Sequence, residues 1–85
     1  MNGIDERTVI HCKDKTEAEQ VLSIFILHNL KWNTGVSYKE ENNYHFHKGE
    51  TCYHPTAGLF SRRSYYAREG YKIISAQEFL DANKI

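Results

Sequence analysis

Hydrophobic residues occur at two different spacings in the first third of the chain, and each spacing predicts one element. Residues 8–12, Thr-Val-Ile-His-Cys, are rich in β-branched side chains and predict a strand. Residues 15–28 repeat apolar positions with the period of a helix, which predicts one long helix with a buried face. That face consists of Ala18, Val21, Leu22, Phe25 and Ile26.

Three local signals mark where helices begin and end. Asp14 precedes Glu17 by three residues, which is an aspartate form of the capping box, and residues 75–78 (Ser-Ala-Gln-Glu) form a second capping box. Asn29 suits the left-handed position that follows a helix, and Leu30 can then fold back on the helix. The first box therefore predicts the start of the long helix, and the second predicts the start of a C-terminal helix.

The middle of the chain predicts turns and short strands. Residues 31–35 indicate a turn, and residues 36–41 indicate a short exposed strand. Residues 44–54 predict a hairpin that reverses at Lys48-Gly49. The chain then predicts a turn, a strand, a short helix, a strand and the final helix, at residues 54–58, 59–60, 61–69, 71–74 and 76–82.

The sequence offers two starting points for the short helix. Ser61 or Ser64 could cap it, and Gly70 would end it in the left-handed conformation, with Tyr71 packing back on Tyr66.

This order of elements predicts the α+β class, with a mostly antiparallel sheet packed by the long helix. The 85 residues indicate one domain, 1–85, in which the polar residues 1–7 are expected to be flexible. A core of this size supplies only about 3–5 kcal/mol of net stability, so we expect a homo-oligomer.

Composition and charge limit the expected class of binding protein and its cellular location. The formal net charge is zero, which disfavours a general duplex-DNA binder. No secretory signal or membrane-spanning apolar run is apparent, and there are only two cysteines, so we expect free thiols and a cytoplasmic location.

Four stretches together resemble a known group of proteins: Val9-Ile10-His11-Cys12 to Glu17-Ala18, Asn29 to Gly35, Thr51-Cys52-Tyr53, and Tyr65-Tyr66 to Leu80. They are similar to a large family of small proteins encoded by phages and prophages of Gram-positive bacteria. Asn29 stands where that family usually has glycine. The resemblance implies a phage protein acting in the cytoplasm of the infected host, in the style of anti-defence sponges that sequester nucleotide-derived immune signals.

The predicted hairpin would gather metal-ligand side chains on one face of the sheet. Its register places His45, His47, Cys52 and His54 together with Glu50. The spacing matches no standard zinc pattern, so we expect a solvated face and no metal or cofactor, with a metal site as the alternative. A Cys52–His45 nucleophile would lack an orienting third group, so we expect no enzyme.

Arginine and aromatic residues are interleaved in the second half of the chain. Residues 51–68 contain three arginines and no acid. Arginine forks match phosphate oxygens, and aromatic faces stack on bases. The plain alternative is that these arginines are ordinary surface residues, and that Trp32 anchors a loop on the core.

We therefore expect a non-enzymatic binding protein for a phosphorylated small molecule such as a cyclic nucleotide. Its arginines would hold phosphate and its aromatic rings would stack on the base. The expected ligand-binding residues are Trp32, Tyr38, Arg62, Arg63, Tyr65, Tyr66 and Arg68. Two alternatives stay open: a protein–protein module that inhibits a host enzyme, and a single-stranded nucleic-acid binder.

Overall fold

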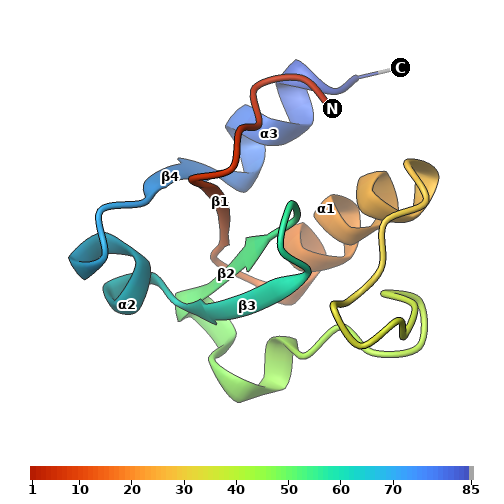
Figure 1. Ribbon diagram of the computed structural model, residues 1–85, viewed down its shortest axis with the longest axis horizontal. Coiled ribbons are helices and arrows are strands. Elements are labelled where there is room, and N and C mark those ends of the chain that lie inside the picture. The colour runs from red at the N-terminus through yellow and green to blue at the C-terminus, as the bar shows by residue number, and fades with distance from the viewer. Residues whose placement is uncertain (85) are drawn as a thin grey trace.

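The computed structural model describes residues 1–84 and has an α+β fold built around one mixed sheet, which confirms the predicted class (Figure 1). Its strands are β1 (Thr8–Cys12), β2 (Thr51–His54), β3 (Leu59–Arg62) and β4 (Lys72–Ser75). Its helices are α1 (Lys15–Leu27), α2 (Arg63–Arg68) and α3 (Ala76–Ala82), with short 3-10 helices η1 (Tyr44–Phe46) and η2 (Lys48–Glu50).

The sheet has the strand order β3-β2-β1-β4. β1 pairs antiparallel with β2, and β2 pairs antiparallel with β3, whereas β1 and β4 are parallel. Ile10 in β1 therefore lies between Tyr53 and Ile74 of the neighbouring strands. Two of the three pairings are antiparallel, which agrees with the predicted mostly antiparallel sheet.

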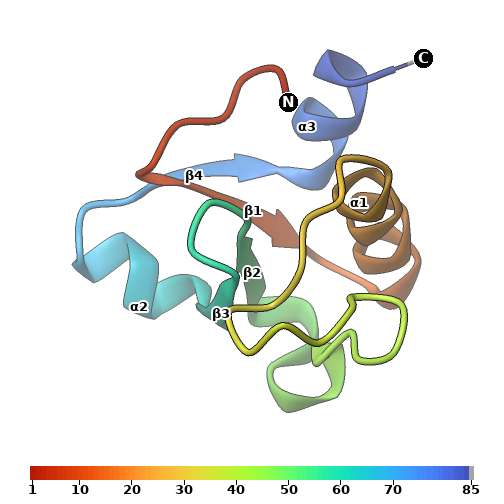
Figure 2. The ribbon, with the colours of Figure 1, turned by 45° about the vertical axis from the view of Figure 1, so that its right-hand side comes forward.

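The two faces of the sheet are covered differently, as Figure 2 shows by the separation of α2 from α1 and α3. The first face packs on α1 and α3 and forms the main core, which includes Ile10, Phe25, Tyr53 and Phe79. The second face carries a smaller cluster in which Val9 and Cys52 pack against Tyr66 of α2. Because α2 has only six residues, it leaves part of the second face open.

Local signals set the helix boundaries as predicted. The Asp14 carboxylate accepts from the Glu17 N–H at 2.8 Å, and the Ser75 hydroxyl accepts from the Glu78 N–H at 3.0 Å. Asn29 has a φ of 60° and ends α1. Four of the five predicted stripe residues of α1 are buried, but Ile26 is 38% exposed, so the buried face is narrower than predicted.

The predicted hairpin at residues 44–54 is wrong. Its first half forms η1 and η2, because Tyr44 is buried in the core and the preceding Asn43 adopts a φ of 57°. The Tyr53 hydroxyl donates to the Asn42 carbonyl at 2.7 Å and holds the segment in this position. β2 accordingly pairs with β1 and β3, not with residues 44–47.

Two smaller predictions are also wrong. Residues 36–41 form no strand, because the Ser37 hydroxyl accepts from the Lys39 N–H at 3.0 Å and turns the chain. Neither Ser61 nor Ser64 caps α2. Arg62 occupies the cap position and makes no side-chain capping bond there.

The two ends of the described chain lie side by side (Figure 1). The Asn2 N–H donates to the Asn83 side chain at 2.9 Å, and Met1 and Ile4 pack against the core. The expected flexibility of residues 1–7 stays a prediction. Within residues 1–84, no helix has the length and apolar character needed to cross a membrane.

Candidate functional site

A cavity of about 250 Å³ opens on the second face of the sheet, beside α2. We call it the α2 cavity. It is lined by His54, Leu59, Phe60, Ser61, Tyr65, Tyr66 and Tyr71. Strands β2 and β3 supply one wall, and α2 with the start of the following segment supplies the other. Two predicted ligand-binding residues, Tyr65 and Tyr66, thus come together with residues that the sequence did not indicate for this role.

Gly70 brings Tyr71 back onto α2. Its φ of 77° reverses the chain after α2, and the Tyr71 N–H then donates to the Tyr66 carbonyl at 3.0 Å. The rings of Tyr66 and Tyr71 meet edge to face, with centroids 4.9 Å apart. This is the packing that the sequence predicted for the end of the short helix.

His54 is the buried polar residue of the α2 cavity. Only 5% of His54 is exposed to solvent. The Nε2 atom lies 2.8 Å from the Glu6 carbonyl oxygen, and because a carbonyl only accepts, Nε2 carries the hydrogen. In the neutral ring, Nδ1 is then an acceptor, and it is buried without a partner. A buried acceptor left unpaired costs about 1–3 kcal/mol.

The tyrosines give the cavity an aromatic wall with one open side. Tyr66 is 3% exposed and burial raises the pKa of its phenol, so the hydroxyl stays protonated at neutral pH. Tyr65 is 42% exposed, and its ring contacts Tyr66 edge to face at 5.3 Å. Tyr65 is therefore the tyrosine of this wall that is most open to solvent.

Guanidinium groups stand around this wall. The Arg68 guanidinium lies 5.9 Å from the Tyr65 ring centroid, and Arg7 lies 4.1 Å above Tyr71. Arg7 is held in place because its Nη2 donates to the Glu69 carbonyl at 2.6 Å. Arg63, the first residue of α2, is exposed and forms no ion pair within residues 1–84.

The structure separates the adjacent pair Arg62 and Arg63. Arg62 donates from Nε to the His47 Nδ1 at 3.3 Å, on the face of the sheet that α1 covers. Cys52 belongs to the second face, and burial raises the pKa of its thiol. The positive charge of Arg63 works against that increase. The two arginines therefore do not form one phosphate clamp.

Arg62 belongs to a different surface, which is aromatic and exposed. We call it the Phe46 surface, and it consists of His45, Phe46, His47, Phe60 and Arg62. Phe46 is 61% exposed and stacks on Phe60, with centroids 5.8 Å apart and an interplanar angle of 29°. His47 also contacts the Phe60 ring at 5.6 Å.

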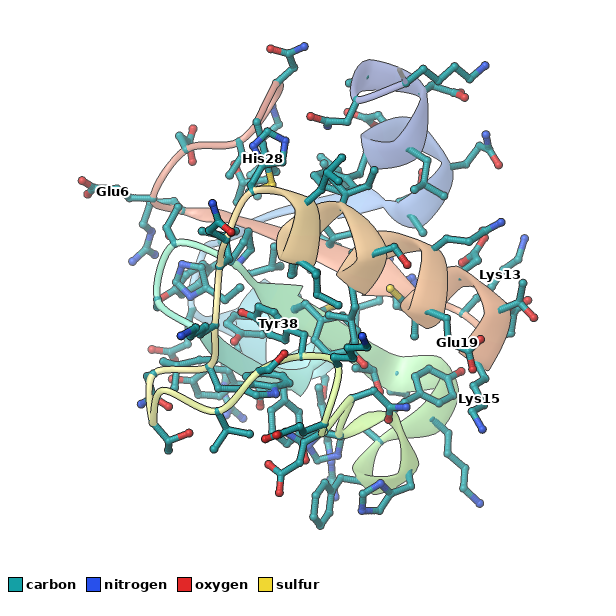
Figure 3. All side chains as sticks on the ribbon, turned by 90° about the vertical axis from the view of Figure 1, so that its right-hand side faces the viewer. Glu6, Lys13, Lys15, Glu19, His28 and Tyr38 are labelled. Atoms are coloured by element: carbon teal, nitrogen blue, oxygen red, sulfur yellow. The ribbon has the colours of Figure 1, made fainter. Side chains whose placement is uncertain are left out.

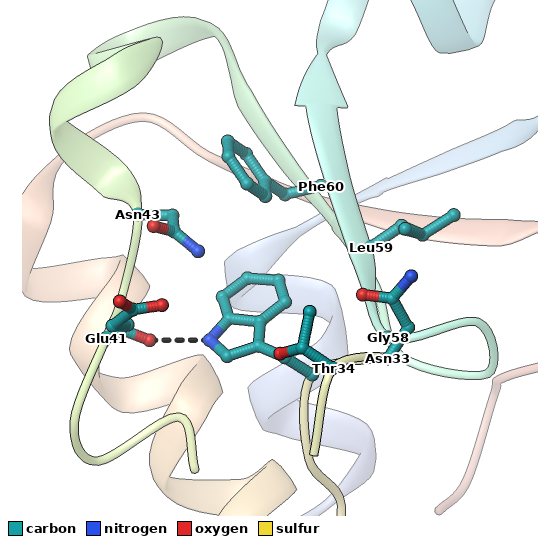
Figure 4. A pocket seen from close by; sticks show the side chains of 8 residues that line it. Asn33, Thr34, Glu41, Asn43, Gly58, Leu59 and Phe60 are labelled. Atoms are coloured by element: carbon teal, nitrogen blue, oxygen red, sulfur yellow. Dashed lines mark hydrogen bonds between the residues drawn. The ribbon is translucent and has the colours of Figure 1, made fainter. Parts of the chain in front are cut away.

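Trp32 and Tyr38 are core residues. The Trp32 indole N–H donates to the Glu41 carbonyl at 2.7 Å, and its ring lies against a hollow of about 190 Å³ that Asn33 and Asn43 border (Figure 4). Only 6% of Trp32 is exposed, as expected for a loop anchor. Tyr38 packs on Phe25 of α1 (Figure 3) and is 3% exposed, so its ring has no free face for a base.

The predicted face of metal-ligand side chains does not form. Its register depended on the hairpin, and without the hairpin His45 and His47 lie on or beside η1, away from Cys52 and His54 in β2. Across residues 1–84, no group of three His, Cys, Asp or Glu side chains is arranged to hold a metal ion. Burial raises the pKa of Cys52 to about 12, so at neutral pH it is a protonated thiol.

Sequence reasoning missed the roles of His54 and Phe46. It treated His54 as part of a solvated face, because that assignment followed from the hairpin register. Tyr71 carried a usable signal, since its packing on Tyr66 was predicted from Gly70. Comparison with known proteins gave no matching family, no matching curated protein and no matching solved structure.

Proposed function

We propose that this chain is a non-catalytic binding protein whose ligand is a phosphorylated, nucleotide-derived small molecule held at the α2 cavity. The observation that carries the proposal is His54. Its acceptor nitrogen is buried without a donor, in a residue that forms the wall of an aromatic cavity. Unpaired buried polar atoms are rare in native proteins. Because Nδ1 is closed to solvent, a hydrogen-bond donor of the ligand would reach it once the surrounding side chains move aside.

The chemistry of the cavity fits a nucleobase. Bases present N–H donors at their edges and flat faces that stack on aromatic rings, which contributes about 1–3 kcal/mol for each base. Tyr65 offers the exposed ring, and the Ser61 hydroxyl adds a second polar group to the wall. A volume of about 250 Å³ accommodates a base, so the phosphate would remain outside.

Arg68 and Arg63 are the residues we assign to the phosphate. Arg68 lies beside the Tyr65 ring, and Arg63 is on the same short helix without an ion-pair partner in the described chain. Guanidinium groups bind phosphate oxygens through charge-assisted hydrogen bonds. The resemblance to phage proteins supports a signal of host antiviral defence as the natural ligand.

Calorimetric titration with cyclic dinucleotides and cyclic ADP-ribose isomers tests the proposal. We expect one of these probes to bind, and replacing both residues (R63A/R68A) should weaken its affinity at least about tenfold, because each charge-assisted bond contributes about 1.5–3 kcal/mol. R62A is the matched control, since Arg62 is also exposed but faces the other side of the sheet. It should leave the affinity unchanged.

Three results would contradict this assignment. The first is that none of the probes binds, and the second is that R62A weakens binding as much as R63A/R68A. The third is binding of oligonucleotides with an affinity that falls steeply with salt, which would identify the chain as a single-stranded nucleic-acid binder.

A further inference from the structure

We propose that the Phe46 surface is the contact between two copies of this chain in a two-fold symmetric dimer. Phe60 borders both this surface and the α2 cavity, whereas Phe46 and Arg62 do not line the cavity. The inference does not depend on the ligand proposed above. It rests on the exposed apolar side chains of the surface, on the arrangement of charges around them and on the position of β3 in the sheet.

The apolar centre of the surface is an exposed aromatic pair. Phe46 is 61% exposed, and the half-buried Phe60 lies against it. The other exposed large hydrophobic residues described lie elsewhere, at Ile26 and Leu27 of α1, at Tyr65 of α2 and at Leu59 on the opposite face of β3. Clustered aromatic side chains of this kind form the desolvated centres of protein interfaces.

β3 is the outer strand of the sheet on this side. The strand order β3-β2-β1-β4 places no further strand of the described chain beyond Leu59 and Phe60. Edge strands with exposed apolar side chains tend to associate with another chain unless something covers them. A second protomer would provide that cover.

Opposite charges flank the apolar centre. On one side, Glu40 and Glu41 border a hollow of about 350 Å³ together with His45 and Phe46. On the other side, Arg62 is oriented by its hydrogen bond to His47. Neither acid nor the arginine forms an ion pair within residues 1–84.

This arrangement is self-complementary. In a two-fold dimer, residue i of one protomer contacts residue j of the other, and the reverse contact forms at the same time. An axis near Phe46 would bring Arg62 of each protomer to the acids of its partner and would bury both Phe46 rings between them. A partner with charge of a single sign would pair either with the two acids or with Arg62, but not with both. We therefore assign a second copy of this chain.

Sedimentation equilibrium tests the apolar part of the proposal. We expect the wild type to dimerise at micromolar concentration, and Phe46→Ser should raise the dimer dissociation constant at least about tenfold, as for a central aromatic contact. Leu27→Ser is the matched control, because Leu27 is 60% exposed on α1, away from the proposed contact. It should leave the dissociation constant unchanged. A monomeric wild type, or equal effects of the two variants, would overturn the proposal.

A mixing experiment tests the symmetry, even if Phe46→Ser should fail to fold. R62E and E40R/E41R each place like charges opposite one another in the proposed dimer, so each variant alone should be monomeric. Mixed in equal amounts, the two variants should form a heterodimer, because one charge pair is then restored with reversed sign and the other is the natural pair of Arg62 with Glu40 and Glu41. Variants that stay monomeric after mixing, or that dimerise alone, would overturn the proposed register.

The two proposals fail independently. R62E should abolish the dimer and leave ligand affinity at the α2 cavity intact, whereas R63A/R68A should weaken the ligand and leave the dimer intact.

Discussion

Two buried tyrosines of the core differ in whether the hydroxyl group has a partner. The Tyr53 hydroxyl donates to the Asn42 carbonyl at 2.7 Å, whereas the Tyr38 hydroxyl is buried without any hydrogen bond in the described chain. Burial raises the pKa of Tyr38 to about 12, so its phenol is neutral at physiological pH. The two residues therefore form a natural pair for testing what an unpaired buried hydroxyl costs.

Tyr38→Phe should leave the free energy of unfolding unchanged or increase it by about 1 kcal/mol, because it removes a polar group that has lost its water without gaining a bond. It should also leave ligand affinity unchanged, since Tyr38 lies in the core. Urea unfolding measures the first effect, and calorimetry measures the second.

Tyr53→Phe is the control for that substitution, with the same change of atoms. It should destabilise the protein by about 1–2 kcal/mol, because it leaves the Asn42 carbonyl without its donor. Destabilisation by Tyr38→Phe of the same size would show that its hydroxyl does find a partner in solution.

At the scale of elements, the turn between β2 and β3 is held against the loop that follows α1. The Asn33 N–H donates to the Gly58 carbonyl at 3.0 Å. A Cβ atom placed on Gly58 would lie 2.5 Å from the Asn33 nitrogen and 2.9 Å from the Lys31 carbonyl oxygen. Only glycine allows this approach of two backbones, and the approach positions Trp32 under β3.

Gly58→Ala should therefore destabilise the protein by more than about 3 kcal/mol, since both the positive φ and the backbone clash oppose a side chain. Gly35→Ala is the matched control. Gly35 also has a positive φ, of 90°, but an added Cβ would meet nothing within 4 Å. It should cost about 1 kcal/mol, so the difference between the two melting curves measures the clash. Equal losses would contradict the close contact.

The elements that could be predicted from the sequence are those fixed by neighbouring residues. Asp14 and Ser75 cap their helices through bonds three residues away, and Asn29 ends α1 by its own backbone preference. Residues 44–54 could not be predicted in this way. Their path depends on contacts of Tyr44 and Asn42 with core residues distant in sequence, which a local hairpin pattern does not reveal.

The candidate site, too, could be predicted only where it depends on residues close in sequence. Packing of Tyr71 on Tyr66 was predictable from Gly70, because it is a contact between residues five positions apart. The separation of Arg62 from Arg63 was not, since it depends on β3 ending and α2 beginning between these two residues. Their adjacency in the sequence indicated one phosphate clamp, and the structure places them on opposite faces.

At the scale of the whole molecule, each of the two hydrophobic clusters contains one buried cysteine. Cys12 lies in the main core and Cys52 lies in the cluster under α2, and both are fully buried. Burial raises the pKa of Cys52 from 9.0 to about 12, and it raises the pKa of Cys12 as well. Above pH 9 the folded protein therefore keeps protons that the unfolded chain has lost.

This difference predicts that stability falls as the pH rises above about 9. The sign follows from the protons: unfolding releases them in this range, so a higher pH favours the unfolded state. Below pH 8 both states hold their thiol protons and the contribution is complete. Between pH 8 and 9.5 the free energy of unfolding should fall by about 1.5 kcal/mol for the two thiols together. Tyr38, Tyr53 and Tyr66, whose pKa burial also raises, add about 0.5 kcal/mol over the same range. Urea unfolding at several pH values measures the slope, and C12A/C52A should remove most of it while lowering stability at every pH. A wild-type stability that stays constant up to pH 9.5 would mean that the surroundings of at least one of the two cysteines open to solvent in the native state.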